Sequence, residues 1–223
     1  MQLDPLDPEA YNNLSVTLIE LGRLDEAEAS LKQAIALNPD YAEAYNNLGV
    51  TFKELGKLED SIDSYKKALS IIPEYAEAHY NLAITLKKLS RFEEAEASLR
   101  QAISLKSNYA EAYNNLGNIL QELGKLDEAV ARLITAIELK PDYVEAWTNI
   151  YFPLNIIKSL ESYSKDYLTL IFNKKIFQLN DVRLSVLKYK LNIGGEHSKF
   201  FFDKAVDLLS ANENIKIQNP EPL

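Results

Sequence analysis

The 223-residue sequence contains no cysteine and only two histidines. Without cysteine the chain can form no disulfide, no thiolate nucleophile and no cysteine-ligated metal site. His79 and His197 have neither a second histidine nor a carboxylate at a spacing typical of metal ligands. The chain also lacks a glycine-rich phosphate-binding loop, since Gly194 and Gly195 stand as a lone pair. We therefore predict no metal, no cofactor and no catalytic site, and expect that this region is not an enzyme.

Long apolar runs are missing as well. No stretch approaches the roughly 20 apolar residues of a membrane span, and the N-terminus lacks the basic region and apolar core of a secretory signal. We expect a soluble, cytoplasmic protein without a membrane partner. The net charge of −9 is uneven, since residues 1–149 hold 14 Lys and Arg against 25 Asp and Glu. Such an acidic region repels phosphates, so nucleic acid is not an expected partner.

The most informative feature that is present is an internal repeat. Residues 42–49 recur unchanged as residues 110–117, and related versions begin at Pro8, Ala76 and Val144, so the period is 34 residues. Each full copy has leucine at position 7, a small residue at positions 8 and 20, and alanine at position 27. Three of the four full copies have proline at position 32. A fixed period of this length predicts stacked repeats instead of one closed core.

This pattern resembles the tetratricopeptide (TPR) repeat. The resemblance implies an all-α, right-handed solenoid of antiparallel helix pairs, with helices near positions 1–14 and 18–31 of each repeat. Ser90 replaces the glycine between the two helices of the third repeat, and Ser107 replaces its terminal proline, so we expect less sharply defined turns there. The predicted repeats are residues 8–41, 42–75, 76–109 and 110–143, followed by the first helix of a fifth at 144–152.

The flanking segments extend this interpretation. Residues 1–7 match the end of a repeat, so we interpret them as the remnant of an upstream repeat and the sequence as a piece of a longer array. Residues 153–214 are predicted to form a helical cap or connector, and residues 215–223 an extended tail. The arrangement loosely resembles bacterial multidomain proteins in which a TPR array precedes a sulfotransferase-like or glycosyltransferase domain.

A row of asparagines is the main candidate site. In TPR arrays the first helix of each pair lines the concave surface, and the array is similar to the superhelical repeats of O-linked N-acetylglucosamine transferase, in which an asparagine ladder holds a peptide backbone. A carboxamide has an acceptor and two donors, which match a peptide unit. The predicted groove residues are Asn13, Asn47, Asn81, Asn115 and Asn149 at position 6, Asn12, Asn46, Tyr80 and Asn114 at position 5, and Val16, Val50, Ile84 and Asn118 at position 9.

Positions 2, 6, 9 and 13 of the first helix are expected to lie opposite its packing side, so alanine at position 6 should barely change stability. The alternative is that asparagine is merely common at this solvated position of the repeat. Chaperone-binding TPR domains hold a carboxylate pair with basic first-helix residues. Here position 2 is always glutamate and position 6 is never basic, so that mode is not expected.

Three functions remain open at this stage. The first is a protein-interaction module that binds an extended peptide or protein segment in the groove. The second is the substrate-recruiting region of a larger transferase. The third is a scaffold that self-associates end to end through its open N-terminal repeat.

Overall fold

The computed structural model describes residues 7–150 and 153. Every regular element within that part of the chain is an α-helix, so the all-α prediction is confirmed. The helices are α1 Pro8–Glu20, α2 Leu24–Leu37, α3 Ala42–Glu54, α4 Leu58–Ile71, α5 Ala76–Lys88, α6 Phe92–Leu105, α7 Ala110–Glu122, α8 Leu126–Leu139 and α9 Val144–Asn149. Apart from Asp7 and Pro153, the predicted upstream remnant, cap and tail lie outside the described residues, as do the last two residues of the predicted fifth-repeat helix.

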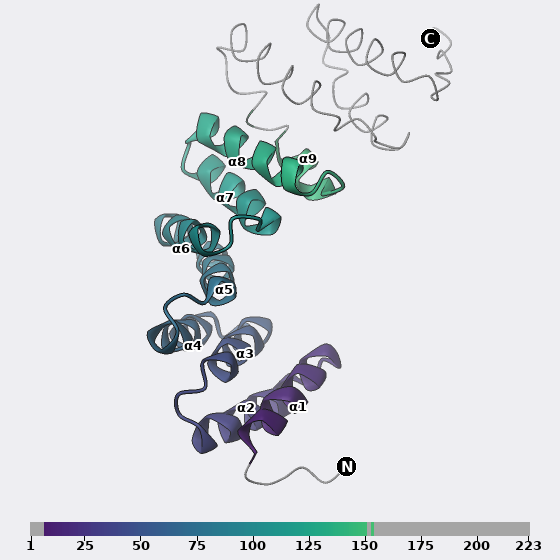
Figure 1. Cartoon of the computed structure of the whole chain (residues 1–223), viewed down its shortest axis with the longest axis vertical. Coiled ribbons are helices and arrows are strands. Elements are labelled where there is room, and N and C mark those ends of the chain that lie inside the picture. Colours follow the sequence, from purple (N-terminus) through teal and green to yellow (C-terminus); the bar gives the residue numbers. More distant parts are fainter. Residues whose placement is uncertain (1–6, 151–152, 154–223) are drawn as a thin grey trace, which may run out of the picture. The chain divides into compact units, whose positions relative to one another are not determined.

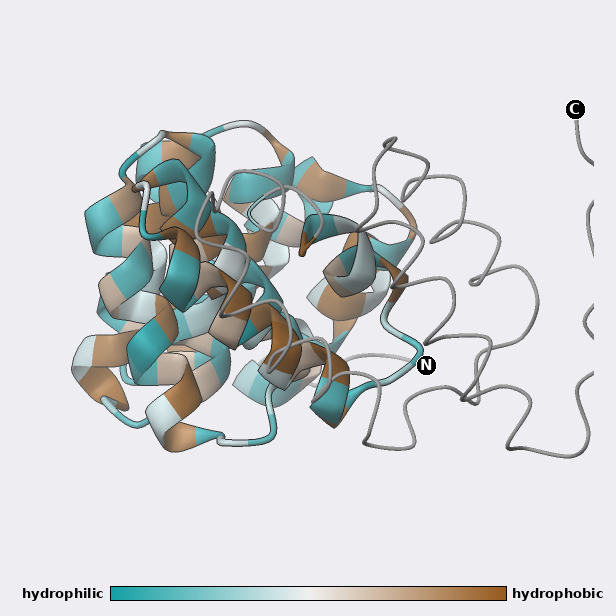
Figure 2. Ribbon diagram, turned by 90° about the horizontal axis from the view of Figure 1, so that it is seen from above, coloured by the Kyte–Doolittle hydropathy of each residue, from teal (hydrophilic) through white to brown (hydrophobic). Residues whose placement is uncertain are grey.

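Consecutive helices pair in antiparallel fashion, α1 with α2, α3 with α4, α5 with α6 and α7 with α8, and each pair packs on the next (Figure 1). In the four complete repeats the first helix spans 13 residues and the second 14. These helices agree with the predicted positions to within one residue. Figure 2 shows hydrophobic and hydrophilic positions alternating along each helix, which is the pattern of helices that bury one side.

A left-handed residue ends the first helix of every complete repeat. Gly22, Gly56 and Gly124 have φ of 71°, 76° and 71°. Glycine adopts this conformation without the steric cost of a Cβ. Ser90 takes the same place with φ 57°, and the next residue, Arg91, donates its N–H to Leu86 O at 3.0 Å. The same bond joins Lys125 N to Leu120 O at 2.8 Å. The third repeat therefore keeps its turn, although serine must adopt an unfavourable backbone conformation.

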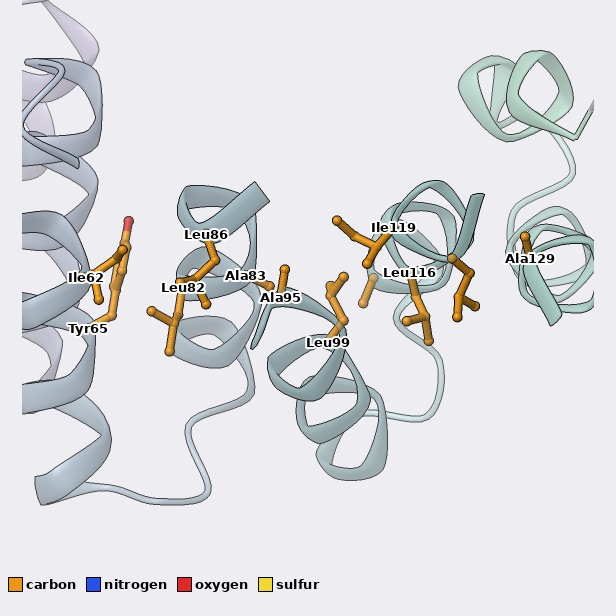
Figure 3. Packing of buried hydrophobic residues seen from close by; sticks show 12 residues of the cluster. Ile62, Tyr65, Leu82, Ala83, Leu86, Ala95, Leu99, Leu116, Ile119 and Ala129 are labelled. Carbon is orange, nitrogen blue, oxygen red and sulfur yellow. The ribbon is translucent and has the colours of Figure 1, made fainter. Parts of the chain in front are cut away.

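The core runs through the stack because small residues let neighbouring helices approach. Ala68 and its equivalents in the other repeats are completely buried. A Cβ built on Gly49 would lie 2.5 Å from the Tyr65 ring, and one on Gly117 would lie 2.5 Å from Leu133 Cγ. Figure 3 shows the buried cluster that links these repeats, from Ile62 and Tyr65 to Ala129. The stacking predicted from the fixed repeat period is therefore present, and the small positions lie where neighbouring helices are in close contact.

Ion pairs on the second helices also join successive repeats. Glu96 accepts from Lys125 of the next repeat at 2.7 Å and from Arg100 of its own helix at 2.7 Å. Burial raises the pKa of the Glu96 carboxyl, but the hydrogen bonds from Lys125 and Arg100 outweigh burial and hold the pKa below its usual value. Glu28 accepts from Lys57 in the same way at 2.8 Å. These carboxylates are therefore ionised partners in the fold at neutral pH.

Candidate peptide-binding face

The first helices of successive repeats form a continuous surface. Helix α1 contacts α3, α3 contacts α5, α5 contacts α7, and α7 contacts α9, whereas contacts between successive second helices are sparser. At about 100° per residue, positions 2, 6, 9 and 13 of a first helix fall within about 60° of one another. We call the surface formed by these positions in α1, α3, α5, α7 and α9 the first-helix face.

Side chains of the first-helix face are all at least partly exposed. The structure places on it Glu9, Asn13, Val16 and Glu20 of α1, Glu43, Asn47, Val50 and Glu54 of α3, Glu77, Asn81, Ile84 and Lys88 of α5, Glu111, Asn115, Asn118 and Glu122 of α7, and Glu145 and Asn149 of α9. The predicted residues at positions 6 and 9 thus share one accessible surface. Whether this surface binds a peptide remains a prediction.

The predicted residues at position 5 are placed differently. The asparagines Asn12, Asn46 and Asn114 are 0%, 1% and 4% exposed, so their side chains are not accessible to a ligand. Tyr80, at the same position of the third repeat, is half-buried, and its ring centroid lies 4.9 Å from that of Tyr109. Helical periodicity explains the correction, because position 5 is turned about 100° from position 6 toward the neighbouring repeat. The inclusion of these three asparagines among the groove residues is therefore wrong, whereas that of Tyr80 remains a prediction.

The side chains at positions 5 and 6 are hydrogen-bonded to each other across each repeat boundary. Asn47 Nδ2 donates to Asn12 Oδ1 at 2.9 Å, and Asn81 Nδ2 donates to Asn46 Oδ1 at 3.1 Å. At the last two boundaries Asn115 Nδ2 donates to Tyr80 Oη at 3.1 Å, and Asn149 Nδ2 donates to Asn114 Oδ1 at 2.9 Å. We call these four bonds the asparagine zipper. Each joins residues 35 apart in the sequence, a pairing that the sequence interpretation did not include.

The zipper gives position 6 a structural role. An Ala substitution there leaves a buried acceptor such as Asn46 Oδ1 without its donor, and such a loss costs about 1–3 kcal/mol. The expectation that alanine at position 6 barely affects stability is therefore not supported by these contacts. The consecutive Asn-Asn pairs in repeats one, two and four were the sequence signal for this pairing.

The same bonds fix which atoms of the carboxamides remain free. Asn47, Asn81 and Asn149 each use Nδ2 in the zipper, and Asn115 Nδ2 donates both to Tyr80 and to Glu111 O at 3.0 Å. Among the described residues, none donates a hydrogen bond to the Oδ1 atoms of these asparagines. The first-helix face therefore carries one available carbonyl acceptor per repeat boundary, held in orientation by the boundary itself.

Other potential sites find structural explanations. His79 Nε2 lies 2.9 Å from Pro73 O, and Trp147 Nε1, at the equivalent position, donates to Pro141 O at 3.0 Å. These half-buried side chains tie a first helix to the preceding proline turn. No group of three His, Cys, Asp or Glu within the described part of the chain could hold a metal ion. No helix there is long and apolar enough to cross a membrane.

Family models agree with this architecture. Models described as TPR repeat match residues 16–56, 51–90, 85–124 and 117–150, and one described as tetratricopeptide repeat matches residues 1–29. These matches cover more than half of the chain. The chain belongs to the tetratricopeptide repeat family. A comparison with curated protein sequences gives no match.

Solved structures of TPR proteins are similar to this chain. TTC0263, a thermophilic TPR protein of Thermus thermophilus, is 29% identical, with a TM-score of 0.59 over 69% of this chain and 84% of that one. YrrB, described as a TPR protein with an unusual peptide-binding site, is 25% identical, with a TM-score of 0.62 over 83% of this chain and 94% of that one. The first TPR of Spaghetti (RPAP3), bound to the HSP90 peptide SRMEEVD, is 28% identical, with a TM-score of 0.50 over 50% of this chain and 89% of that one.

Proposed function

We propose that this protein is a protein-interaction module whose first-helix face binds an extended peptide segment. The observation that carries the proposal is the row of Oδ1 atoms at Asn47, Asn81, Asn115 and Asn149, one at each repeat boundary, which accept no hydrogen bond from the described residues. An extended backbone presents N–H groups at regular intervals. A row of carbonyl oxygens can accept hydrogen bonds from these groups whatever side chains the peptide carries.

Preorganisation adds to this argument. Because the zipper already holds each carboxamide, binding does not have to order the side chain, and the entropic cost of binding is smaller. The partly exposed Val50 and Ile84 supply apolar contact beside the carbonyl row. The descriptions of YrrB, which has a peptide-binding site, and of the RPAP3 repeat, which is bound to a peptide, support peptide binding as a general use of repeats of this family.

Acidic tails such as SRMEEVD are not expected ligands of this face. Position 2 is glutamate in all five first helices, namely Glu9, Glu43, Glu77, Glu111 and Glu145. A carboxylate-rich peptide would meet this row with like charge, which disfavours binding. The predicted absence of the carboxylate-binding mode is thus part of the proposal.

The test uses a peptide selected from a random phage-displayed library against the full chain. Its affinity is then measured for Asn47→Ala/Asn81→Ala and for the control Asn12→Ala/Asn46→Ala. Both variants break the same two zipper bonds, but only the first removes carbonyls from the first-helix face. We expect at least a tenfold loss for the first variant, which is about 1.4 kcal/mol, and a smaller loss for the control, which keeps both carbonyls and loses only their preorganisation. Equal losses in both variants, or selection of no peptide, would contradict the proposal.

A further inference from the structure

We propose that the segment bound by the first-helix face is rich in lysine and arginine. This inference rests on the proposed function, since it names the chemistry of the peptide held there. It is carried by the charge layout of the face, by the small number of its carboxylates that form ion pairs within the described part of the chain, and by the orientation of the carboxamides.

Two rows of acid frame the face. The first-turn row is position 2 of each first helix, and consists of Glu9, Glu43, Glu77, Glu111 and Glu145. The last-turn row is position 13, and consists of Glu20, Glu54, Lys88 and Glu122. The rows are about 16 Å apart along each helix, and positions 6 and 9 form a central band of asparagine and aliphatic side chains between them.

Helix electrostatics accounts for the first-turn row but not for the last-turn row. Carboxylates near a helix N-terminus are stabilised by the macrodipole, whereas carboxylates in the last turn are destabilised by it. Glu20, Glu54 and Glu122 are the final residues of α1, α3 and α7. Three of the four complete repeats thus have a glutamate in the last turn of the first helix, where the macrodipole favours a basic side chain. Helix stability therefore does not explain this row.

Within residues 7–150, most carboxylates of the two rows also lack a counter-ion. Among the described residues, only Glu54 and Glu111 of these rows form ion pairs, with Lys53 at 3.3 Å and Lys140 at 3.0 Å. In contrast, several second-helix glutamates are paired, namely Glu26, Glu28, Glu59, Glu94, Glu96 and Glu128. Six of the eight carboxylates of these rows thus form no ion pair within the described residues. Second-helix acids such as Asp25, Glu93 and Asp127 form none there either, but only the rows place such carboxylates on both sides of the central band.

The carboxamides strengthen the preference for a donor-rich partner. Asn47, Asn81 and Asn149 each donate one amide N–H within the zipper, and Asn115 Nδ2 donates twice. At most one N–H and a carbonyl oxygen with two lone pairs are therefore left to a ligand at each boundary, so acceptors outnumber donors. The central band and both rows thus present acceptors. Lysine and arginine side chains carry donors and no acceptor, so they match this surface.

The spacing fits an extended basic segment that crosses the first helices along the central band. Alternate side chains of an extended chain point in opposite directions, and each acidic row lies about 8 Å along the helix axis from the middle of the band. Lysine and arginine stems can pack on Val16, Val50 and Ile84 while their charged groups reach the rows. The structure thus accommodates cations on both sides of the segment.

The experiment uses three fluorescently labelled peptides of equal length, built from Lys-Gly-Ser, Thr-Gly-Ser or Glu-Gly-Ser units. Their binding to the full chain is measured by anisotropy at low and physiological salt. We expect the lysine peptide to bind at least tenfold more tightly than the threonine peptide, the glutamate peptide to show no binding, and the difference to shrink as salt increases.

Two matched variants locate the effect. Glu20→Gln/Glu54→Gln/Glu122→Gln neutralises the last-turn row, whereas Asp25→Asn/Glu93→Gln/Asp127→Asn removes the same charge from the second helices. The first should lose about tenfold in affinity for the lysine peptide without loss of thermal stability, and the second should lose less than about threefold.

Equal losses in the two variants would overturn the inference, because net charge alone would then account for binding. Lysine and threonine peptides of equal affinity would also overturn it. If the threonine peptide then still depended on Asn47 and Asn81, the proposed peptide-binding function would stand without the basic preference. If no peptide depended on these asparagines, both proposals would fail.

Discussion

The asparagine zipper makes a quantitative prediction at the boundary between the second and third repeats. Asn46 is 1% exposed and accepts a hydrogen bond from the half-buried Asn81 at 3.1 Å. Asn81→Ala leaves the buried Asn46 Oδ1 without a donor, which costs about 1–3 kcal/mol in unfolding free energy. The better helix propensity of alanine returns a few tenths of a kcal/mol. We therefore expect a net destabilisation of about 1–2 kcal/mol.

Asn46→Ala tests the other half of the pair. This substitution leaves the Asn81 amide without its acceptor. Because that amide is partly exposed, it can donate to water instead, so the lost hydrogen bond itself costs only about 0.5–1.5 kcal/mol. The deleted buried side chain adds a cavity cost on top of this. Because both single variants break the same bond, the double variant should be less destabilised than the sum of the two. The expected coupling energy is about 1 kcal/mol.

Urea denaturation of the four proteins in this cycle measures the coupling, and hydrogen exchange of the amides in α3 and α5 locates it. Asn13→Ala is a useful control, because the Asn13 side chain forms no zipper bond among the described residues. Asn13→Ala should leave stability within about 0.5 kcal/mol of the parent. A coupling energy near zero between Asn46 and Asn81 would refute the assignment of the zipper as a stabilising contact.

Three further predictions concern turns, packing and pH. Ser90→Gly should stabilise the chain by about 1 kcal/mol in urea denaturation, because the left-handed backbone then carries no Cβ; a destabilised variant would contradict this. Gly49→Ala should cost about 1–3 kcal/mol, since its Cβ would overlap the Tyr65 ring, although helix propensity favours alanine; a melt at or above the parent temperature would show that the ring can move away. Hydrogen bonds from Lys32 and Lys57 hold the pKa of Glu28 below 4.5, so the folded state binds fewer protons than the unfolded state. Stability should be constant from neutral pH to about 5 and fall as the pH drops through the lowered pKa; a decrease that begins near pH 6 would exclude this explanation.

The helices were predictable because their determinants are local and repeated. The 34-residue period, the proline and glycine positions and the apolar spacing predicted helix bounds to within one residue. Ser90 was recognised as a departure from the pattern, and the structure shows how the turn is kept: the serine takes the conformation that glycine takes elsewhere. The small residue at position 8 was also recognised as part of the pattern, and the structure shows that Gly49, at this position, is in tight contact with Tyr65.

The candidate site was predictable only in part. Position 6 and position 9 lie on an accessible face, but position 5 is buried, and the two asparagine positions bond to each other across the repeat boundary. A single helical wheel places Asn46 and Asn47 about 100° apart, but it does not show which side chain of the adjacent repeat each one contacts. These contacts depend on how far each first helix is displaced relative to the first helix of the next repeat. The displacement brings residue i into contact with residue i+35.

The sequence by itself determined the repeat, its helices, its turns and the small residues at its interfaces, because each of these depends on neighbours within a few residues or on a period that is visible in the chain. Only the tertiary structure decided which carboxamides are hydrogen-bonded within the protein and which glutamates have a counter-ion. Those properties depend on the stacking of one helix pair on another. Glu96 and Glu77 are both acidic residues of the third repeat, yet stacking brings Lys125 to the first and no basic partner within the described region to the second.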